Sequence, residues 1–250
     1  MIAGDPDRPL RVPDPDGSEA AEVLRQGEMT VHGRIAGSSN ATLLVTCALD
    51  GAELAAVYKP ARGERPLWDF PSGLHRREVA AYELSAALGW GIVPRTVART
   101  DGPYGPGSVQ RLVPEDGQAH YFTLRENPRW HPALVTIAAF DVLANNADRK
   151  SGHVLLAEGQ LWAIDNGLSF HTEEKLRTVI WDFCGEPLPA HLLADIERLS
   201  TKGVPGIFGD LLAPDEVEAL GRRVEALVSQ GCLPLPDEDR EWPPYPWPLV

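Results

Sequence analysis

The stretch of sequence that most constrains this chain runs from residue 140 to residue 170 and reads FDVLANNADRKSGHVLLAEGQLWAIDNGLSF. It places Asp148 in a polar loop and Asp165 directly after a strand-like run. Between them, two short apolar runs around a Glu-Gly-Gln turn predict a β-hairpin. This layout suits phosphoryl transfer, in which one carboxylate orients an acceptor hydroxyl and another holds a metal ion on phosphates. The simpler interpretation is two ordinary Asp-containing turns.

Composition and charge narrow the class of protein. The chain has 23 Lys and Arg residues against 36 Asp and Glu residues, which gives a net charge of −13. A nucleic-acid partner is therefore not expected, because binding it requires a basic surface. The three cysteines lie far apart without a CxxC pair, so neither a zinc site nor a disulfide framework is supported. A signal peptide and a membrane-spanning run are both absent from the pattern, and a cytoplasmic location is expected.

The pattern along the chain predicts two lobes between two Pro-rich ends. Residues 1–20 are rich in Asp and Pro and are expected to form a flexible arm. Residues 21–113 predict an N-lobe of antiparallel strands with one helix, and residues 114–233 predict a mainly helical C-lobe, which makes the fold α+β. Residues 234–250 are too Pro-rich for a helix or a central strand. This tail is expected either to pack on the body through its aromatic side chains or to bind a partner.

The individual elements follow from apolar periodicity and from turn residues. In the N-lobe, Asp50-Gly51 predicts a hairpin turn, and Gly89 ends a helix that begins at Leu74. The predicted N-lobe strands lie near residues 29–35, 42–48, 54–58, 92–98 and 108–113. The predicted C-lobe helices begin at Pro132, near Ala190 and after Pro214, where Pro suits the first turn.

Lys59 ends the third predicted strand, in the apolar run AVYKP. Because an isolated buried ammonium is costly, it should have an acidic partner. Glu78 is the best candidate, since it lies on the following helix on the same face as Leu74 and Tyr82. A Lys–Glu pair of this kind orients a lysine toward nucleotide phosphates. The alternative is a surface lysine whose stem covers apolar groups while its ammonium reaches water.

The loop GSSNA joins the first two predicted strands. Its backbone N–H groups and hydroxyls could cradle phosphates. It matches neither a G-x-G-x-x-G nor a Walker A pattern, so a plain hairpin loop is the alternative.

The predicted helix before Asp148 places Asp141 and Asn145 on one face, because the two residues are four positions apart. Apolar neighbours such as Leu134 and Ala138 indicate that Asp141 is a half-buried anchor for the loop that follows.

These motifs carry a family resemblance. Lys59, Glu78, NNADRKSGHVLL and AIDNGLSF resemble the phosphatidylinositol 3-/4-kinase-like branch of the protein-kinase fold. They are most similar to type II phosphatidylinositol 4-kinases, more distantly to HipA-like kinases, and also to an actinobacterial branch of that group. In this branch N-x-D-R replaces the His-Arg-Asp of other protein kinases, and I-D-x-G replaces Asp-Phe-Gly. The resemblance covers about residues 28–185 and implies a bilobal protein-kinase-like fold.

The resemblance also implies roles for single residues. Asp148 would be the catalytic-loop aspartate, and Asp165 would bind the metal ion. Lys59 would hold the nucleotide phosphates, with Glu78 keeping it in place. The remaining nucleotide contacts would come from the phosphate-covering loop and the hinge beside adenine, namely Ser38, Ser39, Asn40, Gln110, Leu112 and Val113.

One position departs from the family pattern. His153 stands where the family normally has Asn, and it is assigned with Asp165 to the metal site. Because magnesium prefers oxygen ligands, His153 implies an altered metal geometry, a preference for manganese or reduced catalysis.

The expected function is an ATP-dependent kinase that uses Mg²⁺ or Mn²⁺. Its acceptor hydroxyl would lie on a protein, on the chain itself or on an inositol lipid, with a protein or a soluble small molecule favoured over a membrane lipid. The alternatives are a nucleotide-binding pseudokinase that acts as a regulator or scaffold, and an interaction module built around the Pro/Trp-rich tail.

Overall fold

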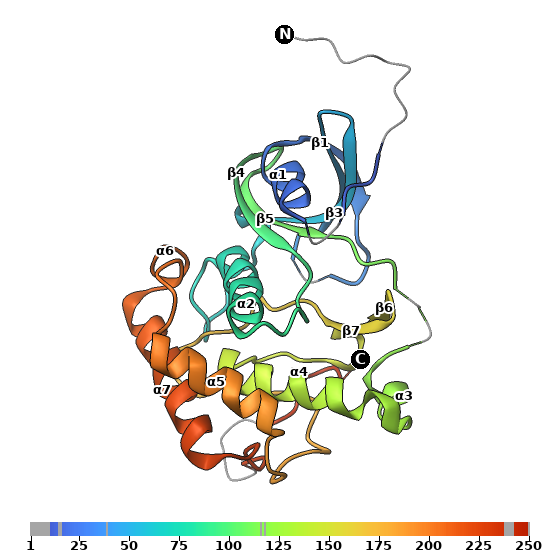
Figure 1. Ribbon diagram of the computed structural model, residues 1–250. Coiled ribbons are helices and arrows are strands. Elements are labelled where there is room, and N and C mark those ends of the chain that lie inside the picture. The colour runs from blue at the N-terminus through green and yellow to red at the C-terminus, as the bar shows by residue number, and fades with distance from the viewer. Residues whose placement is uncertain are drawn as a thin grey trace. The chain divides into compact units, whose positions relative to one another are not determined.

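The computed structural model describes residues 11–14, 17–38, 40–115, 117, 119–237 and 243–249. Its contacts divide the chain into two compact units (Figure 1). Unit 1 comprises Met1–Val79 and Pro94–Val113, and unit 2 comprises Ala80–Val93 and Pro114–Val250. The lobe boundaries expected from the sequence stay a prediction.

Unit 1 contains a five-stranded sheet in the order β1-β2-β3-β5-β4, and every neighbouring pair is antiparallel. The strands are β1 (Glu28–Arg34), β2 (Leu43–Leu49), β3 (Ala52–Pro60), β4 (Thr96–Gly102) and β5 (Gly105–Arg111). The predicted turn between β2 and β3 is confirmed: Asp50 and Gly51 have φ angles of 49° and 79°. Two successive positive φ angles produce the tight turn whose twist matches antiparallel strands.

A helix that the sequence pattern does not predict covers this sheet. Helix α1 (Ser18–Gln26) packs on β2 to β5 (Figure 1). Its buried face carries Ala20, Val23 and Leu24, which join Val45 and Tyr58 in one apolar cluster. Unit 1 therefore contains α1 in addition to the one helix expected, and α1 covers the apolar face of the sheet.

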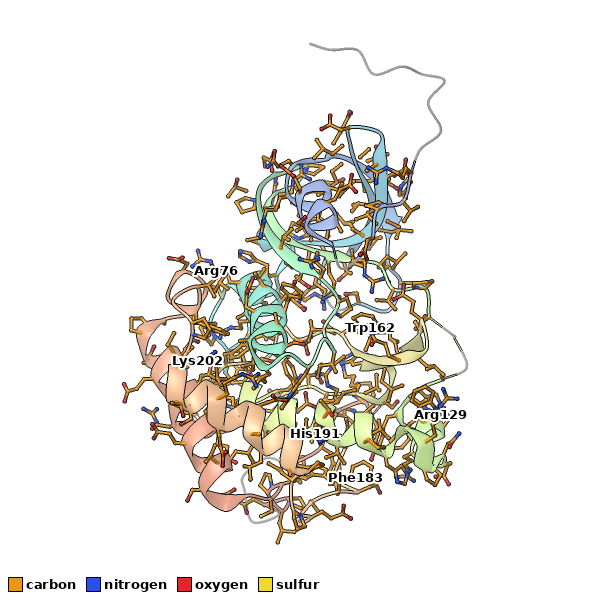
Figure 2. The ribbon with its side chains drawn as sticks, in the orientation of Figure 1. Arg76, Arg129, Trp162, Phe183, His191 and Lys202 are labelled. Carbon is orange, nitrogen blue, oxygen red and sulfur yellow. The ribbon has the colours of Figure 1, made fainter. Side chains whose placement is uncertain are left out.

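Unit 2 is mainly helical, with one hairpin. Its helices are α3 (Tyr121–Leu124), α4 (His131–Ala144), α5 (Ala190–Lys202), α6 (Phe208–Leu211) and α7 (Pro214–Gln230), and α2 (Leu74–Leu88) begins in unit 1 and continues here. Helix α7 packs against both α4 and α5 (Figure 1). Strands β6 (Val154–Ala157) and β7 (Gln160–Ala163) form the predicted hairpin, and Trp162 of β7 is buried (Figure 2). The α+β fold class is confirmed.

The predicted strand at residues 92–98 begins too early. Residues Ile92 and Val93 lie in the turn after α2, where their N–H groups donate to the Ser85 hydroxyl. The Ile92 carbonyl accepts a hydrogen bond from Ala163 at 2.7 Å. Because these groups are occupied, contact with β5 begins at Arg95, whose carbonyl accepts from the Arg111 N–H at 2.8 Å, and β4 pairs with β5 from Thr96 onward.

The described part of the tail, residues 234–237 and 243–249, packs through buried prolines and not through the Trp247 ring. Pro244 and Pro246 are buried, whereas Trp247 is 88% exposed and Tyr245 is 42% exposed. Trp242 lies outside the described residues. Among the described residues of the tail, packing therefore rests on prolines and backbone, and the expected aromatic packing does not hold for Trp247.

Within the part of the chain that the structure describes, every helix is too short or too polar to cross a bilayer.

Candidate functional site

The loop of interest begins where α4 ends. Asn145 caps α4 in the left-handed conformation, with φ 53° and ψ 51°. Its side-chain NH₂ group donates to the carbonyls of His171 and Glu173 at 3.0 and 2.6 Å. Its carbonyl oxygen accepts from the Lys175 N–H at 2.9 Å. The end of α4 is thereby joined to the segment that follows β7.

A buried ion pair holds the loop from beneath. The Arg149 guanidinium donates to both carboxylate oxygens of Asp141, with distances of 2.9 to 3.1 Å, and both side chains are fully buried. It also donates to the Ile164 carbonyl and to the Asn166 side chain, each at 2.6 Å. Asp141 is therefore completely buried, rather than half-buried, because Arg149 neutralises it.

This network ties the two acidic motifs together. Arg149 lies in the Asp148 loop, whereas Ile164 and Asn166 flank Asp165. Asn166 is held from its other side as well, because its NH₂ group donates to the Ala163 carbonyl at 3.1 Å. The network thus fixes the position of one motif relative to the other.

Asp148 is partly buried and directly precedes Arg149, the centre of this network. Its backbone N–H donates to the Asn146 side chain at 2.9 Å, and one carboxylate oxygen lies 3.0 Å from the Lys150 ammonium. Burial raises the pKa of the Asp148 carboxyl, while Lys150 opposes that shift and the negative charge of Asp165 adds to it. The carboxylate therefore has a cation beside it and a second acidic group within electrostatic range.

Asp165 and His153 complete the cluster. The His153 Nε2 atom lies 3.4 Å from an Asp165 carboxylate oxygen, and its Nδ1 atom lies 3.0 Å from the Asp148 carbonyl. The Asp165 side chain is 51% exposed, so it can reach a ligand. Its backbone is left-handed with φ 56°, and Phe170, which closes the same segment, has φ 65°. The structure thus brings Asp148, His153 and Asp165 together.

Asp148, His153 and Asp165 can hold a metal ion only together with further ligands. The described residues contain no group of three His, Cys, Asp or Glu side chains that could hold a metal by themselves. Magnesium in phosphate-transfer sites is usually bound by one or two carboxylates and completed by water and substrate phosphates. The half-exposed Asp165 carboxylate next to the His153 imidazole fits a metal that arrives with phosphates.

Lys59 and Glu78 in unit 1 form the ion pair expected from the sequence. Lys59 lies at the end of β3, opposite Ser108 of β5, and Glu78 lies in the second turn of α2. The Glu78 side chain is only 3% exposed, whereas that of Lys59 is 20% exposed. The ammonium therefore keeps access to solvent while its partner is fixed in place.

The loop between β1 and β2 is held by its own polar groups. The Ser38 hydroxyl lies 2.6 Å from the Thr42 hydroxyl. The Asn40 side chain accepts from the Arg65 N–H at 2.9 Å, and Arg34 donates to the Ser38 and Asn40 carbonyls. Ser39 lies outside the described residues. The phosphate-binding role of this loop stays a prediction.

Of the three predicted hinge residues, Gln110 lies in β5, and Leu112 and Val113 follow it. The Gln110 side chain is buried and donates to the Thr96 hydroxyl at 2.8 Å. The Leu112 N–H donates to the Ala55 carbonyl at 2.9 Å, and Val113 is buried. The Gln110 amide and the Leu112 N–H therefore already have protein partners, and contact of these residues with adenine stays a prediction.

Sequence reasoning missed another acidic group, Glu64, which caps α2. Its carboxylate accepts from the backbone N–H groups of Gly73 and His75 at 2.9 and 2.8 Å, and from the His75 ring at 2.6 Å. Burial raises the pKa of Glu64, but these hydrogen bonds outweigh burial and lower the pKa to about 2. Because Glu64 precedes the helix by ten residues, no capping motif at the helix start revealed it.

Replacing Glu64 with glutamine should lower the free energy of unfolding by roughly 2 kcal/mol at pH 7, because charge-assisted hydrogen bonds are lost. The depressed pKa means that this stability is present above about pH 4.5, the ordinary value, and disappears as the pH falls toward about 2. Urea unfolding followed at several pH values should show the two proteins converging in acid. Glu28→Gln, at an exposed carboxylate of unit 1, is the matched control. A gap that stays constant with pH would contradict the assignment.

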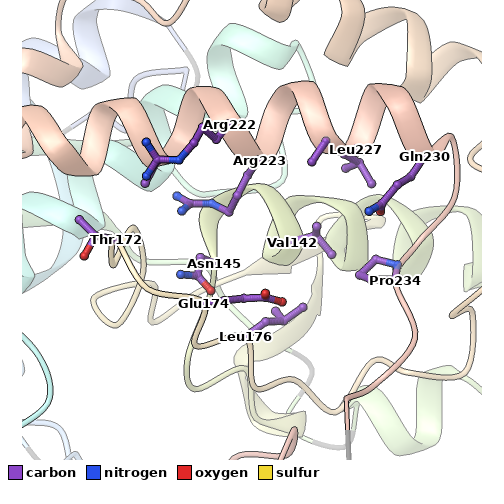
Figure 3. Close-up of a pocket in the computed structure, with 12 residues that line it drawn as sticks. Val142, Asn145, Thr172, Glu174, Leu176, Arg222, Arg223, Leu227, Gln230 and Pro234 are labelled. Carbon is purple, nitrogen blue, oxygen red and sulfur yellow. The ribbon is translucent and has the colours of Figure 1, made fainter. Parts of the chain in front are cut away.

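A separate cavity of about 280 Å³ lies between α7, the end of α4 and residues 172–176 (Figure 3). Arg223 crosses this region and donates to the carbonyls of Leu143 and His171 at 2.8 and 3.2 Å. Burial lowers the pKa of Arg223 to about 10. The lining contains none of the clustered acidic residues, so this cavity is distinct from the site around Asp148.

Comparison with known proteins gives two kinds of match. No family model matches the chain. Among solved structures, a crystal structure of the Golgi casein kinase with Mn/ADP bound has a TM-score of 0.54 at 17% identity, covering 85% of this chain and 74% of that one. The structure of hydra Fam20 with sugar has a TM-score of 0.52 at 14% identity, covering 88% and 90%. These similarities show that the fold is protein-kinase-like.

A relative in sequence is Protein Rv2133c of Mycobacterium tuberculosis (strain ATCC 25618 / H37Rv). The two are 39% identical over 265 aligned positions, which span 90% of this chain and 94% of the relative. The expected membership of the phosphatidylinositol kinase-like group is not shown by these matches. The chain belongs to the family of Protein Rv2133c, and its fold is that of the protein kinases.

Proposed function

We propose that this protein is an ATP-dependent phosphotransferase that transfers the γ-phosphoryl group to a hydroxyl acceptor. The observation that carries the proposal is the cluster of Asp148, His153 and Asp165 at the base of the β6–β7 hairpin. A kinase-like fold with two carboxylates on these two loops supports this chemistry over two unrelated turns.

Asp148 is the group proposed to orient the acceptor hydroxyl and to accept its proton. Its partly buried carboxylate has one oxygen on Lys150, which leaves the other oxygen for a hydroxyl. Positioning of this kind accounts for most of the catalysis in phosphoryl transfer, because the transferred group needs little covalent assistance. The Lys150 charge also favours the ionised form of Asp148.

Asp165 and His153 are proposed to hold a divalent metal together with the nucleotide phosphates. When bound, such a metal neutralises the charge that develops on the phosphates. Lys59, fixed by Glu78, is proposed to bind the α- and β-phosphates. Ser38, Ser39 and Asn40 would cover the phosphates, and the segment that includes Gln110, Leu112 and Val113 would contact adenine.

The acceptor is proposed to be a hydroxyl on a protein, including this chain, or on a soluble small molecule. A net charge of −13 disfavours approach to an anionic membrane surface. An inositol lipid acceptor, as the resemblance to phosphatidylinositol kinases implies, is therefore the less favoured choice.

The test is incubation of the purified protein with γ-labelled ATP and either Mg²⁺ or Mn²⁺, followed by intact-mass measurement and a hydroxyl-acceptor panel. Metal-dependent phosphate transfer is expected, and Asp165→Asn should abolish it. Asp210→Asn, at an exposed carboxylate of α6, should leave it unchanged. Equal activity in wild type and Asp165→Asn would refute the metal role. If ATP and metal raise the unfolding temperature but no phosphate reaches the protein or any acceptor, the result would instead indicate the pseudokinase alternative.

A further inference from the structure

The loop that carries Asp148 is paired along its backbone with residues 177–179. The Arg149 N–H donates to the Arg177 carbonyl at 3.0 Å, and the Arg149 carbonyl accepts from Val179 at 3.1 Å. Thr178 lies between these two bonds, and its hydroxyl donates to Asp141 at 3.3 Å. The Thr178 N–H therefore points away from Arg149 and needs a different acceptor.

The last described residues of the chain, 243–249, supply that acceptor, and we call them the strap. The Pro244 carbonyl accepts from the Thr178 N–H and from the Trp181 indole, each at 3.1 Å. Farther along, the Leu249 carbonyl accepts from the Ser151 N–H at 2.9 Å. Ser151 and Thr178 are both buried. The strap thus satisfies two buried donors, one within the catalytic loop and one beside it.

Proline content suits the strap to this position. The sequence from residue 243 to residue 249 reads PPYPWPL, in which four of the seven residues are proline. Proline fixes φ and has no N–H, so the segment stays extended and offers carbonyl acceptors with few donors of its own to satisfy. Because its conformational freedom is already low, ordering it on unit 2 costs little entropy.

Buried and exposed side chains alternate along the strap. Pro244 and Pro246 face the protein, whereas Trp247 is 88% exposed and Tyr245 is 42% exposed. The strap is therefore held by its prolines and its carbonyls, and the exposed Trp247 ring contributes little to holding it. Replacing an exposed ring and replacing a buried proline should then have very different effects.

We propose that the strap is a positioning element for phosphate transfer: it holds Ser151 and Thr178 so that Asp148 keeps its orientation toward the acceptor. This inference rests on the proposed function, because it assigns Asp148 a role in transfer. Asp148 lies three residues before Ser151, and Arg149 between them is paired to the strand-like residues that the strap covers. Loss of the strap should therefore loosen the loop without unfolding the helices.

The first test is hydrogen exchange, which needs no enzymatic activity. Two variants are compared with wild type: a chain that ends after residue 242, and the full-length Pro246→Asp. Both should lose at least about 10-fold protection at the Ser151 and Thr178 amides, while amides within α7 stay protected. Trp247→Ala is the matched control and should keep full protection, since this side chain is 88% exposed. Unchanged protection in both test variants would overturn the proposal.

The second test measures transfer. Truncation should lower kcat by about 10-fold or more with an unchanged KM for ATP, because the loop orients the acceptor rather than the nucleotide. A synthetic peptide of residues 243–250 should restore both kcat and amide protection, and a peptide with Pro246→Asp should restore neither. An increase in kcat on truncation would overturn the proposal and mark the strap as inhibitory. If wild type transfers no phosphate, the proposed function fails, and the exchange measurement still decides whether the strap orders the loop.

Discussion

Replacing Arg149 with methionine is expected to lower the free energy of unfolding by about 3–5 kcal/mol, because it leaves the Asp141 carboxylate buried without its charge partner. Both side chains are fully buried, and the guanidinium also contacts Ile164 and Asn166. No other described cation forms a salt bridge with Asp141. Urea unfolding followed by circular dichroism provides the measurement.

The same unit contains a suitable control for Arg149→Met. Arg222 forms an ion pair with Glu218 at 2.7 Å, but the two side chains are 57% and 73% exposed. Arg222→Met should therefore cost less than about 1 kcal/mol, since exposed ion pairs contribute little. Adding Asp141→Leu to Arg149→Met should recover part of the lost stability, because the uncompensated charge is removed. Equal effects of Arg149→Met and Arg222→Met would contradict the structural role given to the buried pair.

Asp148→Asn is expected to lower kcat for phosphate transfer by about 10²–10⁴-fold, the usual contribution of a positioned general base. The amide has almost the same shape, so the loop should keep its fold, but it cannot accept the acceptor proton. The KM for ATP should change little, because the proposed nucleotide contacts lie elsewhere. Steady-state kinetics with the best acceptor from the panel measures both constants.

Two further observations make the Asp148 result interpretable. Asp210→Asn should retain wild-type kcat, which controls for loss of one negative charge in unit 2. Thermal unfolding of Asp148→Asn should stay close to wild type, in contrast with Arg149→Met. A variant that keeps full kcat would remove Asp148 from the reaction, whatever its stability.

Local patterns predicted those parts of the fold that depend on local chemistry. Helix α2 was predicted from the spacing of its apolar residues and from Gly89, which has a positive φ of 78°. The β6–β7 hairpin was predicted because Glu158-Gly159 separates two apolar runs, and both residues have positive φ angles. Such signals involve only a few neighbouring residues, so they can be recognised without knowledge of the tertiary structure.

The parts that were missed depend on distant partners. Helix α1 has only nine residues and follows a segment rich in Asp and Pro, and the sheet that buries its apolar face comes later in the chain. The start of β4 was misplaced because Ile92 bonds to Ala163, which lies 71 positions away. Neither contact has a signal in the local sequence.

In the candidate site too, some contacts follow from the local sequence and others depend on distant partners. The Lys59–Glu78 pair was predicted, because a buried lysine requires an acid and the next helix offers one on the correct face. Arg149 was overlooked, although it is fully buried and binds Asp141, because a charged residue in a polar loop is normally exposed. The contact of His153 with Asp165 depends on how the hairpin returns the chain, and only the structure shows that distance.

The left-handed conformation of Phe170 has a consequence for engineering. A bulky residue at φ 65° carries conformational strain, and Phe170 tolerates it because its ring is fully buried and packs edge-to-face on Phe208. Asp165 lies five residues earlier at φ 56°, a conformation that Asp adopts more readily than a bulky residue does. Glycine at either position would relieve the strain but would give up ring packing or the carboxylate. Glycine at Phe170 would therefore change stability alone, whereas glycine at Asp165 would also remove the proposed metal ligand.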